Sequence, residues 1–282
     1  MAESEGGGLA VDRRETLTSR IFASDEESVR KELGIHGQRW ASIFDGYFSD
    51  PEAARALVEA VERAIEASRP AVAADLGGGT GFVLEELLRR GLKGVRLVNV
   101  EVSEKQLAAC EDRRILPLRI SADRVVRRQL LGDDERLLLM ARSMLHYFGN
   151  AGLDPLLRHL QSQLRPGEFF VHQSACYQLQ KDADLMNHLY ERMETRKWFF
   201  TEKKLKERLE HAGFLVREVI PAPRLEMKSK DLGERYGLGP EQRISLGREI
   251  ERLYDPNPKI FLCSEDGFIA WLHFCIFTCE AV

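Results

Sequence analysis

The chain has 282 residues, of which 44% are hydrophobic and 30% charged, the composition of a folded globular protein with a sizeable core. Its formal net charge of −4 excludes a bulk positive field that would attract nucleic acid or anionic lipid, and its longest apolar run, residues 268–278, is too short to span a bilayer. The five cysteines lack the paired spacing of zinc ligands, so we expect no metal site and reduced thiols in a cytoplasmic protein.

The first 70 residues predict helices that precede any strand. Residues 1–16 are acidic and glycine-rich at their start, unlike a signal peptide, and are expected to be disordered. A helical pattern begins at Asp25 and ends at Gly34, and the aromatic stretch 38–48 has helical spacing. A further helix follows the cap Ser49-Asp50-Pro51-Glu52 and runs to the break at Pro70.

Residues 71–81, Ala-Val-Ala-Ala-Asp-Leu-Gly-Gly-Gly-Thr-Gly, predict a buried strand that breaks into a glycine turn before a helix. The dinucleotide fingerprint Gly-x-Gly-x-x-Gly would need a small residue at Phe82, and the Gly-Lys-Ser/Thr ending of a phosphate-binding loop is absent. The pattern is instead Asp-x-Gly-x-Gly-x-Gly. Its members are Asp75, Gly77, Gly79 and Gly81, with Gly78 as an extra glycine. A turn without any ligand is the alternative, but four glycines carry a conformational cost that needs a reason.

After this turn, strands alternate with helices, which predicts a mostly parallel sheet with helices on both faces. A ligand then binds beyond the carboxyl ends of the strands. The strands are expected at residues 95–102, 117–122, 136–141, 169–174, 214–220 and 267–278. Helices are expected between them at residues 103–112, 125–130, around 156–160 and at 202–213. An insertion at about residues 223–262, with a helix around 244–254 that ends before Asp255-Pro256, precedes the last strand.

The glycine turn resembles motif I of the class I, Rossmann-like, S-adenosylmethionine-dependent methyltransferases, and the segment from Thr201 to Phe214 resembles the one before their sixth strand. The resemblance implies a seven-stranded sheet with an antiparallel last strand, and S-adenosyl-L-methionine as cofactor. It implies an N-terminal helical cap at residues 17–70 and a methyltransferase domain at 71–282. In small-molecule methyltransferases such a cap covers the substrate, and packing on the sheet edge is the alternative for the aromatic stretch.

The same resemblance assigns cofactor-binding roles. The backbone at the glycines touches the methionine and ribose parts of the cofactor, and Asp75 lies near its ammonium. Glu101, at the end of the second strand, would accept hydrogen bonds from the ribose hydroxyls. Ala122 and Asp123 resemble the Ala-Asp motif in which the acid accepts from the adenine amino group, and the alternative for Asp123 is the N-cap of the next helix.

Arg142 to Phe148 resembles the Lys-x-x-Leu-His-Asp-Trp segment of plant-type O-methyltransferases. There the basic residue, here Arg142, touches the cofactor, and the histidine, here His146, deprotonates a hydroxyl. Tyr147 and Phe148 depart from the family's aspartate and tryptophan. A structural histidine bonded to backbone is the alternative for His146.

The sequence therefore predicts an S-adenosylmethionine-dependent methyltransferase that acts on an oxygen or nitrogen of a small molecule, without nucleic-acid or membrane partners. The acceptor and the oligomeric state, including a homodimer, stay open. The competing hypotheses are a methyltransferase-like cofactor-binding protein with a regulatory or scaffolding role, and another enzyme of the same fold. Aminopropyl transfer and a nicotinamide-dependent oxidoreduction are the two such reactions.

Overall fold

The computed structural model describes residues 40–282, and the side chains of residue 44 and of residues 46–282. The expected disorder of residues 1–16 and the helix expected from Asp25 to Gly34 lie outside the described residues. The helices are η1 (Trp40–Ser49, a 3-10 helix), α2 (Pro51–Ser68), α3 (Phe82–Arg89), α4 (Glu104–Ala109), α5 (Arg127–Leu130), η2 (Leu145–Phe148, also 3-10), α6 (Gly149–Ser162), α7 (Gln180–Arg192), α8 (Glu202–His211), α9 (Ser229–Tyr236) and α10 (Pro240–Tyr254). The strands are β1 (Val72–Leu76), β2 (Arg96–Val100), β3 (Ile115–Leu118), β4 (Leu137–Arg142), β5 (Phe169–Tyr177), β6 (Phe200–Thr201), β7 (Phe214–Lys228), β8 (Phe261–Ser264) and β9 (Gly267–Ala281).

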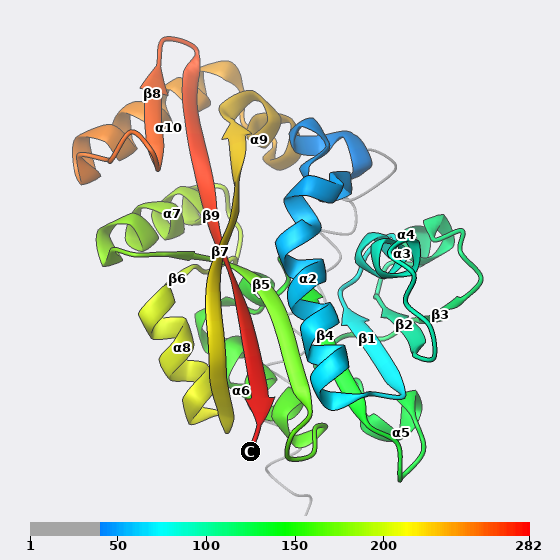
Figure 1. Cartoon of the computed structure of the whole chain (residues 1–282). Helices are drawn as coiled ribbons and strands as arrows, with labels where there is room; N and C mark the ends of the chain where they lie inside the picture. Colours follow the sequence, from blue (N-terminus) through cyan, green and yellow to red (C-terminus); the bar gives the residue numbers. More distant parts are fainter. Residues whose placement is uncertain (1–39) are drawn as a thin grey trace, which may run out of the picture. The chain divides into compact units, whose positions relative to one another are not determined.

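The strands form one sheet in the order β3-β2-β1-β4-β5-β9-β7 (Figure 1). β3, β2, β1, β4 and β5 are parallel, and β9 is antiparallel to β5 and to β7. This confirms the expected fold class, including the antiparallel last strand. The strand order reverses between β1 and β4, and ligands of open α/β sheets bind beyond the carboxyl ends of the strands at such a point.

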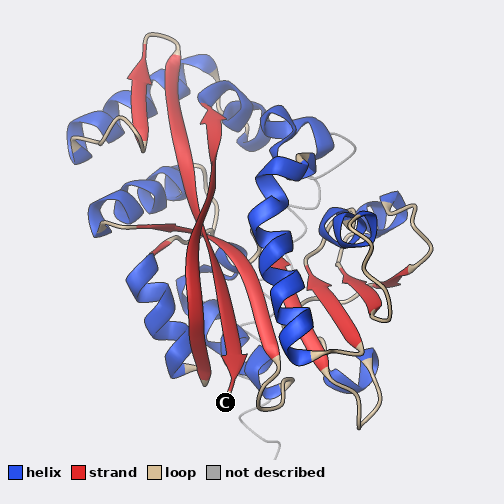
Figure 2. Cartoon of the chain, viewed as in Figure 1, coloured by secondary structure: helices blue, strands red, loops and turns tan. Residues whose placement is uncertain are grey.

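Apolar side chains alternate between the two faces of the central strands, as a sheet covered on both sides requires. In β4, Leu137 and Leu139 face one core cluster, together with residues of α6 and α8. Leu138 and Met140 face the other, together with residues of α2 and α3. Figure 2 shows helices on both sides of the strands. The two cores hold the carboxyl ends of β1 and β4 side by side, because both strands are buried on both faces.

The helix α2 begins where the sequence predicts. Asp50 caps it by accepting a hydrogen bond from the backbone N–H of Glu52 at 2.9 Å, Pro51 follows, and Arg69 ends it in the left-handed conformation. Its buried face packs on the sheet with α3. The division into a cap at residues 17–70 and a methyltransferase domain stays a prediction, and within it α2 lies on the sheet.

Two short strands and three helices lie outside the predictions. The expected sheet has seven strands, whereas residues 40–282 form nine, because two short strands lie off the seven-strand path: β6 pairs with β5, and β8 pairs with β9. The helix α7 (Gln180–Arg192) lies between the strand and the helix that were predicted on either side of it, in a stretch without a predicted element. The helices η2 and α9 were not predicted either.

The third strand lies earlier than predicted. β3 ends at Leu118, opposite the last residue of β2, so residues 119–122 have no strand to pair with. The expected strand at 117–122 is therefore wrong in its second half. The segment 121–123 belongs to a turn, and α5 starts only at Arg127, later than the expected helix from Val125.

The strand expected at 214–220 continues to Lys228. Pro221 and Pro223 would disrupt a central strand, but β7 is at the edge of the sheet, where a missing N–H is tolerated. β9 pairs with this extension, and α9, α10 and β8 gather at its far end (Figure 1). The helix expected around 244–254 is α10, and it ends at Tyr254 before the prolines.

Within the described part of the chain, no helix is both long enough and apolar enough to cross a membrane. The same residues contain no group of three or more His, Cys, Asp or Glu side chains arranged to hold a metal ion.

Candidate cofactor site

The glycine turn connects β1 to α3 at the carboxyl edge of the sheet. Gly77, Gly79 and Gly81 have positive φ angles of 66°, 59° and 84°, which side chains rarely adopt. Gly78 is needed for a different reason. A Cβ atom there would lie 2.5 Å from the Asn99 amide oxygen and 2.7 Å from a carboxylate oxygen of Asp75. The turn therefore packs closely against the side chains of Asp75 in β1 and Asn99 in β2.

Asp75 is 1% exposed and stands next to Asn99, its register partner on β2. Neither oxygen of the Asp75 carboxylate has a hydrogen-bond partner within residues 40–282. Burial raises the pKa of Asp75 to about 7, while the positive charge of Arg142 lowers it and Glu101 raises it. A buried carboxylate without a donor is costly, so this position is suited to a ligand that brings a positive charge.

Asn99 of β2 stabilises the glycine turn through a hydrogen bond. Its side-chain amide donates to the carbonyl oxygen of Gly79 at 2.9 Å, and the residue is fully buried. Asn99 is not among the site residues selected from the sequence, although its position as a polar residue within the apolar run Leu97-Val98-Asn99-Val100 was a signal for it.

Glu101 also supports the turn. Its carboxylate accepts from the backbone N–H of Gly79 at 3.2 Å and from that of Ser103 at 2.8 Å. Burial raises the pKa of Glu101, and these backbone hydrogen bonds lower it. Each carboxylate oxygen has two lone pairs, so the same group can accept further hydrogen bonds, and its contact with a ribose stays a prediction.

Arg142, the last residue of β4, connects the sheet to η1. Its guanidinium donates to the carbonyl oxygens of Phe48 at 2.9 Å and Tyr47 at 3.2 Å, and its Nε donates to the side chain of Gln173 at 3.3 Å. The guanidinium carbon also lies 5.4–5.8 Å from the ring centres of Tyr47, Phe48 and Phe82. A guanidinium can serve several acceptors in its plane and rings on its faces, and Arg142 uses both capacities.

Tyr47 anchors the same helix from the other side. Its hydroxyl donates to the carbonyl oxygen of Pro223 in β7 at 2.6 Å and accepts from Gln173 at 3.0 Å. Burial raises the pKa of Tyr47 to about 12, so this hydroxyl keeps its proton and remains a donor. η1 is thereby held to β4, β5 and β7 at once.

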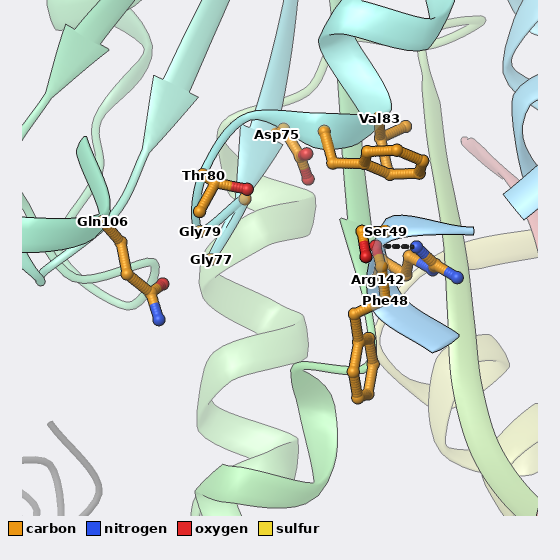
Figure 3. A pocket seen from close by; sticks show the side chains of 11 residues that line it. Phe48, Ser49, Asp75, Gly77, Gly79, Thr80, Val83, Gln106 and Arg142 are labelled. Atoms are coloured by element: carbon orange, nitrogen blue, oxygen red, sulfur yellow. Dashed lines mark hydrogen bonds between the residues drawn. The ribbon is translucent and has the colours of Figure 1, made fainter. Parts of the chain in front are cut away.

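One pocket is lined by residues of both regions. Figure 3 shows Arg142 beside Phe48 and Ser49, and Asp75 of β1 just before the glycine turn. Five residues selected from the sequence line it, namely Asp75, Gly77, Gly78, Gly79 and Arg142. Six that the sequence analysis did not select line it too, namely Phe48, Ser49, Thr80, Phe82, Val83 and Gln106. Phe48 belongs to the predicted aromatic stretch, whereas nothing in the sequence marked Gln106.

The other selected residues do not line the pocket. Gly81 is part of the glycine turn, and Glu101 is hydrogen-bonded to that turn at Gly79. Ala122 is buried. Asp123 accepts a hydrogen bond from the Ser121 hydroxyl, within the turn that follows β3. Since Val126 occupies the N-cap of α5, the alternative role of Asp123 as that cap is wrong.

His146 is buried in η2, just after β4. Its ring stacks on Phe199 with centroids 5.4 Å apart, and its centroid lies 4.4 Å from that of Tyr147. The structure thus places the candidate base beside an aromatic cluster rather than in the wall of the glycine-turn pocket.

A methyltransferase-domain family model matches residues 50–219, more than half of the chain. The chain belongs to this family. The match confirms the predicted class I methyltransferase and its cofactor, S-adenosylmethionine. It begins at the N-cap of α2 and includes the glycine turn, Glu101, Arg142 and His146. No curated protein matches the chain.

Solved structures agree on the methyltransferase fold. A putative methyltransferase from Bacillus halodurans is 14% identical, with a TM-score of 0.60 over 79% of this chain and 97% of that one. The YcgJ protein of Bacillus subtilis is 10% identical, with a TM-score of 0.58 over 80% and 98%. The 1,6-didemethyltoxoflavin-N1-methyltransferase of Burkholderia thailandensis is 16% identical, with a TM-score of 0.51 over 99% and 93%. At these identities the likeness concerns the fold.

The residues of this methyltransferase fit the cofactor. Asp75 offers a buried carboxylate that lacks a donor among residues 40–282, and S-adenosylmethionine carries an ammonium. Gly77, Gly78 and Gly79 line the pocket without side chains, so a ligand can approach the backbone closely there.

Proposed function

We propose that this chain transfers a methyl group from S-adenosylmethionine to an oxygen or nitrogen atom of a small-molecule acceptor. One observation carries the proposal: Phe48 and Ser49 of η1 line the same pocket as the glycine turn, and Arg142 bonds that helix in place. An acceptor has to reach the cofactor past this covering helix. Such enclosure suits a small molecule better than a residue on a large, folded partner.

Three other features support a small acceptor. The net charge of −4 provides no field for nucleic acid, and residues 142–148 lack the Asn/Asp-Pro-Pro-Tyr/Phe motif of enzymes that methylate bases or glutamine amides. The structural neighbour from Burkholderia thailandensis is named for N1-methylation and was crystallised with 1,6-didemethyltoxoflavin and S-adenosylhomocysteine.

When bound, S-adenosylmethionine supplies an already activated methyl group. The task of the chain is then to hold the acceptor atom in line with it, and such positioning is worth roughly 7–11 kcal/mol. In this proposal Asp75 pairs with the ammonium, Glu101 accepts from the ribose, and Ala122 with Asp123 borders the adenine. Arg142 holds η1 in place on the side of the pocket that faces away from the glycine turn.

We further propose that His146 accepts the proton of the acceptor. It follows β4 at the edge where the cofactor turn ends, and an imidazole ordinarily titrates near pH 6.5, which suits a base at neutral pH. Its stacking on Phe199 orients the ring. The structural alternative is a histidine that only fills this aromatic wall.

The test combines binding and turnover on the purified chain. Calorimetry should detect S-adenosylhomocysteine but not NAD, and S-adenosylhomocysteine should be released from S-adenosylmethionine when a panel of hydroxy and amino compounds is supplied. Cofactor binding without transfer to any acceptor would favour the regulatory or scaffolding role. Binding of NAD instead would favour an oxidoreductase. Cytoplasmic location and a homodimer stay predictions, to be checked by fractionation and light scattering.

A further inference from the structure

The glycine-turn pocket has an anion and a cation in its wall. Asp75 pairs in register with Met140 on the neighbouring parallel strand β4, and Arg142 stands two residues further along that strand. Side chains two residues apart on a strand point to the same face and are about 7 Å apart along it. Asp75 and Arg142 therefore project from the same face of the sheet, and both line the pocket (Figure 3).

The two opposite charges do not bond to each other. Neither carboxylate oxygen of Asp75 has a hydrogen-bond partner within residues 40–282, so the Arg142 guanidinium does not donate to it. Burial raises the pKa of Asp75 to about 7 and the positive charge of Arg142 lowers it, so the two groups act on each other from a distance. A buried anion and a neighbouring cation that stay apart suit a ligand that carries both charges itself.

Arg142 has more donors than those that hold η1. A guanidinium carries five N–H groups. The Nε of Arg142 donates to Gln173, one terminal nitrogen donates to the Phe48 carbonyl oxygen, and the other donates to the Tyr47 carbonyl oxygen. Each terminal nitrogen has a second N–H that none of these three bonds uses. Two such groups are the number that a two-point contact with a carboxylate requires.

The guanidinium of Arg142 is fixed before any ligand binds. Its three hydrogen bonds orient it, and the ring centres of Phe48 and Phe82 lie 5.6 Å and 5.8 Å from its central carbon. A donor that is already ordered loses less conformational entropy on binding than a flexible one does. Arg142 thus has the features of a binding residue as well as those of a support for η1.

We propose that Asp75 and Arg142 together bind the amino-acid end of S-adenosylmethionine, Asp75 its ammonium and Arg142 its carboxylate. The ammonium and the carboxylate are attached to the same carbon atom. A site for both therefore needs an acceptor and a donor close together, and the neighbouring strands β1 and β4 provide them. This inference rests on the proposed function, which places the ammonium of the cofactor at Asp75.

Recognition of the carboxylate discriminates between two reactions that the sequence left open. Aminopropyl transfer uses a cofactor without this carboxylate, because the aminopropyl group is the methionine side chain after the carboxylate has been lost. Such a cofactor carries only positive charges, on its nitrogen and its sulfur, and the guanidinium of Arg142 repels them as like charges. The pocket therefore selects the carboxylated cofactor.

The test compares two ligands by calorimetry on the purified protein. One is S-adenosylhomocysteine, and the other is its decarboxylated analogue, which keeps the adenosine, the sulfur and the ammonium. The wild-type protein should bind S-adenosylhomocysteine at least tenfold more tightly than the analogue. In Arg142→Met the two dissociation constants should come within about twofold of each other, because Asp75 still accepts from both ammonium groups.

The ratio of the two constants separates lost recognition from a loosened η1, which weakens both ligands alike. Tyr47→Phe is the matched control, because it removes the hydrogen bonds of the Tyr47 hydroxyl with Pro223 and Gln173 but keeps the guanidinium. Its ratio should stay at tenfold or more while both affinities fall. If Arg142→Met does not fold, Arg142→Gln, which keeps a donor without the charge, is measured in its place.

The proposal is overturned if wild type binds the two ligands within twofold of each other, or if the Arg142 variant keeps the wild-type ratio. A turnover measurement separates this inference from the proposed function. Methyl transfer from S-adenosylmethionine together with equal affinities for the two ligands would refute the carboxylate site alone. A tenfold preference that is lost in the Arg142 variant, without methyl transfer to any acceptor, would refute the proposed function and leave the carboxylate site.

Discussion

The guanidinium of Arg142 donates a hydrogen bond to the backbone carbonyl oxygen of Phe48 at 2.9 Å. This contact joins the end of β4, where the cofactor pocket opens, to the helix that covers it. Because its charge also lowers the pKa of Asp75, Arg142 acts on both walls of the pocket at once. The covering helix and the ionisation of Asp75 are therefore linked through one side chain.

Replacing Arg142 by methionine should release η1. The carbonyl groups of Tyr47 and Phe48 lose their donor, and each buried group left unpaired costs about 1–3 kcal/mol. We expect a lower unfolding temperature and at least tenfold weaker binding of S-adenosylhomocysteine in calorimetry. Arg208→Met is the control, because Arg208 likewise donates to a carbonyl oxygen and stacks on Phe200, but in a different part of the chain. If both variants bind alike, Arg142 does not close the pocket.

Asp75 should make cofactor binding depend on pH. With a pKa of about 7, raised by burial, its carboxylate ionises only as the pH rises through neutrality, and the ammonium of the ligand prefers the ionised form. Affinity for S-adenosylhomocysteine should therefore increase about tenfold or more from pH 5.5 to 7.5. In Asp75→Asn it should be weak and nearly independent of pH. A flat profile in the wild-type protein would exclude this role for Asp75.

The same ionisation affects stability, with the opposite sign. Because the folded protein binds the Asp75 proton more tightly than the unfolded chain does, the ligand-free protein should lose stability as pH rises from about 4 to about 7. Asp75→Asn removes this contribution, so its unfolding free energy should fall less over that range than the wild-type value. Urea unfolding at several pH values measures the difference.

Two ligands, adenosine and S-adenosylhomocysteine, should distinguish the role of Glu101 from that of Asp75. Glu101→Gln weakens support of the glycine turn at Gly79 and removes the charged acceptor for the ribose, at a cost on the order of 1–3 kcal/mol. We expect weaker binding of both adenosine and S-adenosylhomocysteine. Asp75→Asn should weaken only S-adenosylhomocysteine, since adenosine has no ammonium. Unchanged adenosine affinity in Glu101→Gln would mean that a residue other than Glu101 contacts the ribose.

Gly78→Ala should disturb the glycine turn through a steric clash of the new Cβ atom with the side chains of Asn99 and Asp75. The new Cβ atom would lie 2.5 Å from Asn99 and 2.7 Å from Asp75, and overpacking of this kind costs about 1–3 kcal/mol. Stability and cofactor affinity should both fall. Gly132→Ala is a matched control, because its Cβ would meet its nearest neighbour, Glu135, at an ordinary 3.6 Å and its φ is not positive. Equal stability and equal cofactor affinity in the two variants would mean that the turn shifts to accommodate the new Cβ atom at no cost.

His146→Gln tests the proton acceptor once an acceptor is known. Loss of a general base typically slows turnover about a hundredfold or more, and the rise of the rate with pH should disappear. His159→Gln provides the control, since His159 bonds to the Val125 carbonyl in another part of the fold. A rate within a few-fold of wild type, with an unchanged pH profile, would leave His146 as part of the aromatic wall.

Local signals determined what the sequence could predict. The cap at Asp50, the apolar run of β1, the glycines after it and the acid that ends β2 are set by neighbours within a few residues or by a fixed spacing. Alternating strands and helices then limit the topology, because parallel strands need crossover helices. The fold class follows from such patterns, and the family and the cofactor follow from the resemblance of the glycine motif to motif I of the methyltransferases. Strand ends do not, since the end of β3 depends on where β2 stops.

Contacts between distant segments were decided only by the tertiary structure. Arg142 and Phe48 are 94 residues apart, and no spacing in the chain marks the backbone carbonyl of one residue as the partner of the other. The hydrogen bond from the Tyr47 hydroxyl to the carbonyl oxygen of Pro223 depends on a long edge strand that tolerates two prolines. Periodicity tells which face of an element is buried, but the packing of whole elements decides which neighbours it meets, as it does for η1 between β4, β5 and β7.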